Sequence, residues 1–326
     1  MRIVIIGYFN GDGSQNGVRI SQAWALQGHN ILSIDFSSNN IITSILKFQP
    51  DFILVTVGRT FDSKILQELK IKGFFLVNWY PDEYSVGDLH GGEWFNDIKG
   101  IYNLIMCETR GIVPLIKGYA DDVIWIPQFF DHRYHKCTEK RLQITPNFDL
   151  GFLGGLNIAQ SSIRINFINN LITDNYNLKI SGTPLYWKEA LEKGKIITGE
   201  YFIQGPLING DMAKFYARTK IGLNFVNDKL PKYELALSNR AFKTVGCGCF
   251  LLTQEVDGLE DMLIPGIHCE TYPGTDYHAL REKIDFFLKN EGIRERIAAQ
   301  GQQHVLKNFN IDKITKEFID EIKKRM

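Results

Sequence analysis

Residues 238–258, SNRAFKTVGCGCFLLTQEVDG, bring together residue types that could do chemistry. Ser238 precedes a predicted short helix, Asn239 to about Gly246, and can serve as its N-cap. The N-terminus of a helix attracts phosphate through its free N–H groups. Arg240 opposes the helix dipole by itself, but its planar guanidinium suits the oxygens of a diphosphate. We therefore expect Ser238, Asn239 and Arg240 to contact a ligand, the alternative being a plain turn between a helix and a strand.

Cys247 and Cys249 stand among glycines in the same stretch and could form a metal site, a redox pair or a packed turn. The cysteines of the chain lie at positions 107, 137, 247, 249 and 269, and none shows the Cys-x2-Cys spacing of zinc sites. Gly246 and Gly248 permit a tight turn into a strand, where small thiols pack well. We predict that both cysteines are packing residues, and we expect no metal site in the chain.

Gly154 and Gly155 end an apolar run, and Arg164 lies in the helix expected after it. Such a loop lets a diphosphate approach the backbone, with Arg164 balancing its charge. The alternative is that the glycines only turn the chain and that Arg164 lies on the surface.

The glycine-rich stretch at residues 7–17, GYFNGDGSQNG, does not fit the dinucleotide fingerprint Gly-x-Gly-x-x-Gly, because Asn16 occupies the place of the third glycine. Asp35 does end the second predicted strand, where a ribose-binding acid would stand. We expect a loop that touches an acceptor or a donor phosphate, the alternative being a plain surface loop. The loop residues assigned to this contact are Asn10, Gly11 and Gly13.

Asp82 follows the predicted strand at residues 74–78 in the stretch NWYPDEYS. A carboxylate at the carboxyl end of a strand could act as general base for an acceptor hydroxyl. A Pro-Asp turn is the alternative. Asp12, in the first glycine loop, is the second candidate for the base.

Short apolar runs alternate with helix-length segments along the whole chain. Most runs are continuous, as in strands buried on both faces of a parallel sheet. The pattern pauses at a polar stretch, residues 127–146, and then restarts, which predicts two Rossmann-like, doubly wound α/β domains in tandem. The expected strands are residues 2–7, 30–35, 52–57, 74–78, 102–107 and 123–127, then 148–155, 177–182, 221–226, 249–253 and 268–272.

We place the first domain at residues 1–143, the second at 144–310 and a C-terminal amphipathic helix at 311–326. One face of this helix is apolar and requires a surface to cover. In doubly wound sheets, ligands bind beyond the carboxyl ends of the strands. With two such domains, the cleft between them is the expected site.

Length and charge limit the classes of protein to which the chain could belong. The chain has 326 residues with 37 Lys plus Arg against 37 Asp plus Glu, so its formal net charge is zero. A nucleic-acid binder usually carries a basic excess, so no nucleic-acid partner is expected. No stretch approaches the ~18 apolar residues of a membrane span, and the N-terminus does not resemble a signal peptide. Together with the scattered cysteines, these features predict a cytoplasmic protein.

The segment SNRAFKTVGCGCFLLTQEVDGLEDMLIPGIHCETY resembles the C-terminal block of the CgeB-type, or spore-maturation protein-like, glycosyltransferases. The family pattern is roughly Arg-x-Phe-Glu, two residues, Ala-Cys-Gly, an apolar strand that ends in Thr, and Gly-Leu-Glu. The residues that match it are Arg240, Phe242, Cys247, Gly248, Leu252, Thr253, Gly258, Leu259 and Glu260. Four further segments are similar to the family: GDMAKFYARTKIGLNF, DLGFLGGLNIAQSSIR, VIWIPQFFDHRYH and IRERIAAQGQQHVLKNFN.

The resemblance implies a GT-B fold among the "group 1" glycosyltransferases, with two Rossmann-like domains that face each other across a cleft. The implied activity is metal-independent transfer of a hexosyl or related sugar from a nucleotide-diphosphate sugar to a hydroxyl acceptor such as a glycan, without a cofactor. The first domain would bind the acceptor and the second the donor. The donor-binding residues assigned on this basis are Gly154, Gly155, Arg164, Ser238, Asn239, Arg240, Lys243, Thr253 and Tyr272.

One position departs from the family. Lys243 stands where the family has the Glu of Arg-x-Phe-Glu. Leu235, next to Glu234, stands where related retaining enzymes carry a second acid. The paired acids that hold the ribose and the donor sugar are thus absent, which leaves a retaining or an inverting course open. A non-catalytic nucleotide-sugar binding protein remains an alternative, and so does an NAD-dependent dehydrogenase, which the broken glycine fingerprint disfavours.

Overall fold

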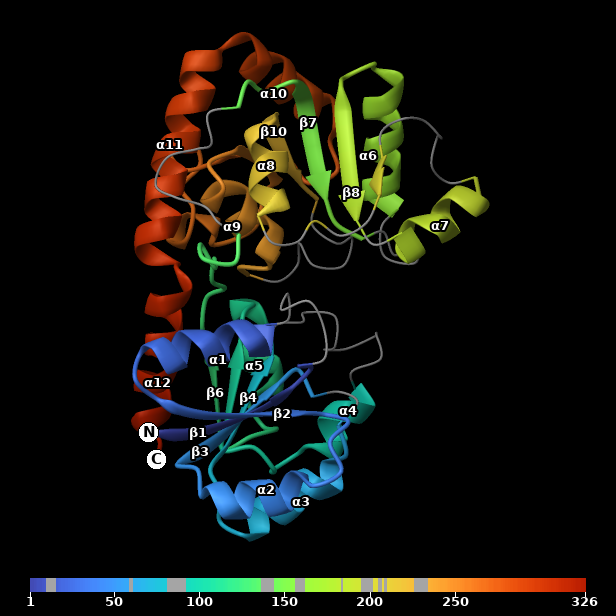
Figure 1. Cartoon of the computed structure of the whole chain (residues 1–326). Helices are drawn as coiled ribbons and strands as arrows, with labels where there is room; N and C mark the ends of the chain where they lie inside the picture. Colours follow the sequence, from blue (N-terminus) through green and yellow to red (C-terminus); the bar gives the residue numbers. More distant parts are fainter. Residues whose placement is uncertain are drawn as a thin grey trace. The chain divides into compact units, whose positions relative to one another are not determined.

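The structure is a computed structural model, which describes residues 1–9, 16–58, 61–80, 92–135, 144–155, 162–182, 184–194, 202–204, 207, 210–225 and 234–326. The chain divides into two compact units. The first consists of Met1–Phe129 and Ile311–Met326, and the second of Phe130–Asn310. Each unit is built on a parallel sheet flanked by helices, which confirms the predicted α/β class (Figure 1).

The sheet of the first unit has the strand order β2-β1-β3-β4-β5-β6, and all of its neighbouring pairs are parallel. Its strands are β1 (Arg2–Gly7), β2 (Asn30–Asp35), β3 (Phe52–Thr56), β4 (Leu76–Tyr80), β5 (Leu104–Cys107) and β6 (Asp122–Trp125). The helices are α1 (Asn16–Leu26), α2 (Ile41–Phe48), α3 (Ser63–Ile71), α4 (Gly92–Asp97) and α5 (Val113–Ile116). Strands β3, β4 and β5 are buried at every position, which explains why they are mostly apolar.

The sheet of the second unit has the strand order β12-β11-β10-β7-β8-β9 and is also parallel. Its strands are β7 (Phe148–Leu153), β8 (Leu178–Gly182), β9 (Phe202–Gln204), β10 (Thr219–Asn224), β11 (Phe250–Gln254) and β12 (Glu270–Tyr272). The helices are α6 (Ser162–Thr173), α7 (Pro184–Glu192), α8 (Asp211–Ala217), α9 (Asn239–Gly246), α10 (Tyr277–Lys289) and α11 (Glu291–Asn308).

Helix α8 ends at Ala217. The chain already enters β10 at Thr219, because Thr219 pairs with Phe148 at the start of β7. The N-cap is Gly210, with a positive φ of 89°. Asp211 lies inside the first turn, where its charge suits the helix dipole.

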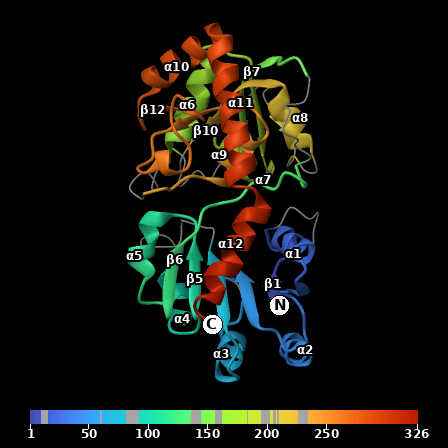
Figure 2. The ribbon, with the colours of Figure 1, turned by 90° about the vertical axis from the view of Figure 1, so that its left-hand side faces the viewer.

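The C-terminal helix α12 (Ile311–Lys323) belongs to the first unit, although it follows the second unit in the chain. Figure 2 shows α12 lying against the sheet of the first unit. Its apolar face buries Ile311, Ile314, Phe318 and Ile322, as the periodicity predicted. Phe318 contacts Trp79 of β4 at 5.9 Å between ring centroids, and the Trp24 indole N–H donates to the Thr315 carbonyl.

The chain passes from the first unit to the second between Phe129 and Phe130. Residues 130–135, which the sequence analysis placed in the first domain, group with the second unit. The Phe130 N–H donates to the Phe309 carbonyl at 2.7 Å, and its ring lies directly against Gly246, where a Cβ would collide with it. These contacts tie the stretch to α9 and α11. In the described part of the chain, no helix is long and apolar enough to cross a membrane.

Candidate donor-binding site on the second unit

The carboxyl edge of the second sheet gathers most of the residues that the sequence singled out. Strand β7 leads into Gly154 and Gly155, β10 ends at Asn224, β11 contains Thr253 and β12 ends at Tyr272. Because these strands are parallel, their carboxyl ends lie at one edge of the sheet. Helix α9 begins beside this edge, since Arg240 in its first turn reaches β7 and β10.

Arg240 spans the ends of two neighbouring strands. Its Nε donates to the Leu153 carbonyl, and its Nη1 donates to Asn224 Oδ1 at 2.9 Å and to the Phe225 carbonyl at 3.4 Å. The guanidinium carbon also lies 4.5 Å from the centroid of the Phe152 ring. These contacts fix a permanent positive charge at the edge of the sheet.

Arg164, on α6, brings a second guanidinium to the same place. Its Nη1 donates to the Gly155 carbonyl at 2.7 Å, and its Nη2 donates to the Phe225 carbonyl at 3.0 Å. The guanidinium carbon is 5.5 Å from the centroid of the Phe152 ring, so both arginines flank one phenylalanine. Arg164 is only 8% exposed, which excludes the alternative that it is a surface residue.

The glycines of this edge are required by close packing. A Cβ at Gly154 would collide with the guanidinium of Arg240, and a Cβ at Gly182 would collide with the Gly154 carbonyl oxygen. The Trp187 indole N–H donates to that same carbonyl at 2.8 Å. Gly154 therefore does more than turn the chain, because the absence of a side chain lets Arg240 reach the end of β7.

Ser238 stands at the N-cap of α9, but its side chain makes no capping hydrogen bond, contrary to our expectation. Its hydroxyl instead donates to Asn224 Oδ1 at 2.8 Å, and the Asn224 amide donates to Thr253 Oγ1 at 2.9 Å. Ser238, Asn224 and Thr253 thus link α9, β10 and β11. Asn224 was missed by the sequence analysis, although it is the one polar residue within the apolar run IGLNFV.

Several buried polar atoms at this edge lack a hydrogen-bond partner in the part of the chain that the structure describes. They include the Tyr272 hydroxyl and Asn239 Oδ1. Burial raises the pKa of the Tyr272 hydroxyl well above its ordinary value, and the positive charge of Arg164 opposes this shift. Buried polar groups are rarely left unsatisfied in native proteins. Tyr272 also packs in the core, with its ring centroid 6.1 Å from that of Phe167.

Lys243 and Leu235, the positions at which the paired acids are absent, lie in the same unit. Lys243 lies in the last turn of α9 and is partly buried. Leu235 is fully buried and has a φ of 54°, a left-handed conformation that a bulky side chain rarely adopts. Its N–H donates to the Asp257 carbonyl at 2.8 Å, which holds the strained residue in place.

Cys247 and Cys249 lie buried in the turn between α9 and β11. Gly248 between them has a φ of 76°, which supports the prediction of a tight glycine turn. The Cys249 thiol donates to the Thr219 carbonyl at 3.5 Å. Among the described residues, no group of three or more His, Cys, Asp or Glu side chains could hold a metal ion.

The acceptor-side residues assigned from the sequence, Asp82, Asp12, Asn10, Gly11 and Gly13, lie outside the described residues.

Within the described part, Asp35 is engaged by the chain itself. Its Oδ2 accepts from the Phe9 N–H at 2.7 Å, and its Oδ1 accepts from the Ser37 N–H and hydroxyl at 2.9 and 2.6 Å. These hydrogen bonds give Asp35 a structural role within the first unit.

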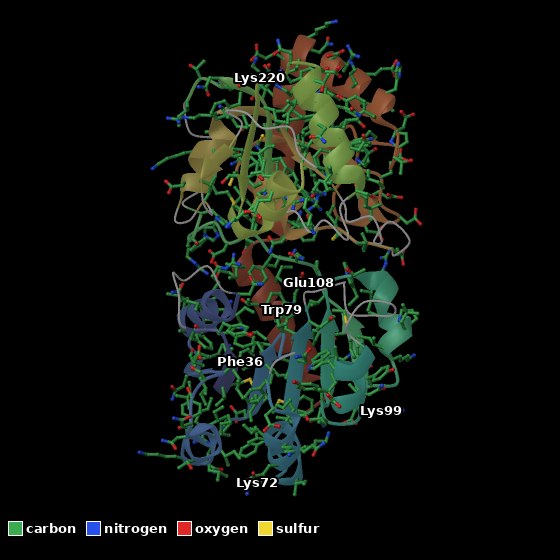
Figure 3. The ribbon with its side chains drawn as sticks, turned by 90° about the vertical axis from the view of Figure 1, so that its right-hand side faces the viewer. Phe36, Lys72, Trp79, Lys99, Glu108 and Lys220 are labelled. Carbon is green, nitrogen blue, oxygen red and sulfur yellow. The ribbon has the colours of Figure 1, made fainter. Side chains whose placement is uncertain are left out.

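Glu108 is a carboxylate that the sequence analysis missed. It follows β5, and both of its carboxylate oxygens are buried. Strand β5 lies next to β4, with Cys107 opposite Tyr80. Glu108 directly follows Cys107, so it lies at the carboxyl edge of the first sheet. In the sequence, Asp82 comes shortly after Tyr80. Figure 3 shows Glu108 at the end of the first unit that is opposite Lys72. The signal in the sequence is an acid directly after the apolar run YNLIMC.

Residues 164–320, just under half of the chain, match the family model described as glycosyl transferase-like. No curated protein matches the chain.

Solved structures cover almost the whole chain at low identity. Sucrose-phosphate synthase from Thermosynechococcus elongatus is 12% identical, with a TM-score of 0.71 over 99% of this chain and 98% of that one. Anabaena Alr3699/HepE in complex with UDP-glucose is 11% identical, with a TM-score of 0.71 over 99% and 100%. An alpha-glucosyltransferase in complex with UDP-glucose and DNA containing an abasic site is 14% identical, with a TM-score of 0.70 over 99% of each chain. The chain therefore has the GT-B fold of these glycosyltransferases.

Proposed function

We propose that the protein is a glycosyltransferase that moves a sugar from a nucleotide-diphosphate sugar to a hydroxyl acceptor. The observation that carries the proposal is the pair Arg164 and Arg240 at the carboxyl edge of the second sheet. Two fixed guanidinium groups next to a glycine turn suit a diphosphate, which needs both charge and close backbone approach. The match of residues 164–320 to a glycosyl transferase-like family supports this reading.

The donor diphosphate, in this proposal, lies at the N-terminus of α9, near Ser238, Asn239 and Arg240. As the bond to the sugar breaks, negative charge develops on the diphosphate, and the two arginines and the helix N-terminus stabilise it. Charge stabilisation of this kind lets the reaction proceed without a metal ion. The solved relatives that contain UDP or UDP-glucose make a uridine nucleotide the first donor to test.

The unsatisfied Tyr272 hydroxyl and Asn239 Oδ1 are further candidates for ligand contact. Lys243 supplies a positive charge where the resemblance implies a ribose-binding acid, so the nucleoside is held differently from that of the family. If the reaction inverts the configuration of the sugar, a base must take the acceptor proton, and we propose Asp82 for this role. Asp12 remains the second candidate. Glu108 is a third, because its buried carboxylate lies at the carboxyl edge of the first sheet.

The test is to incubate the full chain with UDP-glucose and other nucleotide sugars, with and without a panel of methyl glycosides. Release of nucleoside diphosphate together with a new glycoside supports transfer. Tight binding of the nucleotide without turnover would favour the alternative of a non-catalytic nucleotide-sugar binding protein. If no nucleoside diphosphate binds, both readings fail, and an NADH fluorescence titration then tests the dehydrogenase.

A further inference from the structure

The carboxyl edge of the first sheet carries a cluster of three aromatic side chains. Tyr8 follows β1, Phe36 follows β2, and Phe61 precedes α3. The ring centroids of Tyr8 and Phe36 lie 4.8 Å apart in an edge-to-face arrangement, and those of Phe36 and Phe61 lie 5.2 Å apart. Phe61 is buried, whereas Tyr8 is 50% exposed. The buried part of the cluster therefore holds a tyrosine ring at the surface; Phe36 is labelled in Figure 3.

The backbone that carries this cluster is fixed by Asp35. The carboxylate accepts hydrogen bonds from the Phe9 N–H and from the N–H and hydroxyl of Ser37. Asp35 thus joins the segment after β1 to the segment after β2. A surface that is already ordered loses little conformational entropy when a ligand binds.

A cavity of about 120 Å³ lies at the turn that follows Phe36. Its polar wall consists of Ser38, Asn39, Asn40 and Thr43, and Ile41 and Ile65 are apolar members of the lining. Asn40 is the N-cap of α2, yet its side chain makes no capping hydrogen bond. Among the described residues, none that lines the cavity is charged. Amide and hydroxyl groups both donate and accept hydrogen bonds, so this lining suits a neutral ligand that carries several hydroxyls.

We propose that the exposed Tyr8 ring and the cavity at residues 38–43 form a carbohydrate subsite. A pyranose has apolar C–H faces that can pack on an aromatic ring, and hydroxyls that can bond to asparagine amides. Phosphate sites usually contain lysine or arginine, and the described residues of this lining include neither. Only the assignment of this carbohydrate as the acceptor rests on the proposed function; the subsite itself does not.

The experiment titrates the full chain with methyl glycosides of glucose, galactose, mannose and N-acetylglucosamine, and follows saturable binding by saturation-transfer NMR. Tyr8→Ala and Asn40→Ala should each raise the Kd of a bound glycoside about fivefold or more. Tyr8→Phe keeps the ring and should bind normally. Phe286→Ala, which removes a 47% exposed aromatic on the second unit, is the matched control and should also bind normally.

The subsite is overturned if no glycoside binds, or if binding survives both Tyr8→Ala and Asn40→Ala in variants whose melting temperatures match that of the parent. Calorimetry with UDP separates this failure from failure of the proposed function. If glycosides bind through Tyr8 but UDP does not bind, the subsite stands and its role as acceptor site falls. If UDP binds and a sugar is transferred while no glycoside binds at Tyr8, the proposed function stands and the subsite falls.

Discussion

Replacing Arg240 with methionine tests the candidate donor site most directly. The side chain keeps most of its length but loses the charge and the hydrogen-bonding fork. If the guanidinium binds a diphosphate oxygen, its loss should cost about 1.5–3 kcal/mol of binding free energy, the range for a hydrogen bond to a charged group. The Kd for UDP should therefore rise about 10- to 150-fold at 25 °C.

The same substitution also removes contacts within the protein. Arg240 donates to the Leu153 carbonyl and to Asn224, and these bonds contribute roughly 0.5–1.5 kcal/mol each to stability. The Phe225 carbonyl keeps its hydrogen bond from Arg164. We expect the free energy of unfolding to fall by about 1–3 kcal/mol, so affinity and stability must be measured on the same sample.

Arg294→Met is the matched control. Arg294, on α11, is 1% exposed and donates to the Phe287 carbonyl at 2.8 Å, so it is a buried arginine of the same unit with a comparable structural role. Calorimetry with UDP and urea unfolding should show a loss of stability in both variants and a loss of affinity in Arg240→Met alone. Unchanged UDP affinity in Arg240→Met, or an equal loss of affinity in both variants, would refute the placement of the diphosphate.

Three further predictions concern other parts of the chain. Replacing both Cys247 and Cys249 with alanine should leave turnover and metal content unchanged, and stoichiometric zinc in the parent that is lost in the double variant would contradict their packing role. Asp82→Asn should lower turnover about 10²- to 10⁴-fold at saturating donor with nearly unchanged UDP affinity; if Glu108→Gln shows this loss instead, Glu108 is the base. Burial, and the nearby imidazole of His304, lower the pKa of His268 below its ordinary 6.5. At acidic pH the unfolded state therefore binds more protons than the folded state. As a result, the contribution of His268 to stability is lost as the pH falls below about 6.5. Urea unfolding from pH 7.5 to 5 should show a smaller loss of stability in His268→Gln than in the parent, and identical pH profiles would count against this assignment.

The sequence determined the class of fold and most of the elements that build it. Continuous apolar runs such as FILVT predict strands buried on both faces, and the structure places this run at β3, the third strand of a six-stranded sheet. The restart of the pattern after the polar stretch predicted a second unit. Period and apolarity are local properties of the chain, and local properties are sufficient to identify buried strands and amphipathic helices.

The tertiary structure decided which distant residues meet. Arg164 and Arg240 are 76 positions apart, as their numbers show, and only the parallel order β10-β7 brings their guanidinium groups to one phenylalanine ring. The hydroxyl of Ser238 could have capped α9, but it donates its hydrogen bond to Asn224 on β10. The sequence of one segment cannot show which of two hydrogen-bond partners a side chain will choose. That choice depends on the strand order and on the residues that the fold brings next to the side chain.

The C-terminal helix shows the same division. Its apolar face was evident from the sequence, and the need for a surface to cover followed from it. Which surface it covers did not follow, because residues 1–129 and 130–310 both offer a sheet flanked by helices. The indole of Trp24 bonds to the Thr315 carbonyl and Phe318 packs on Trp79, so the helix returns to the unit in which the chain began. The position of α12 is thus determined by packing between side chains that lie far apart in the sequence, and these contacts exist only in the folded protein.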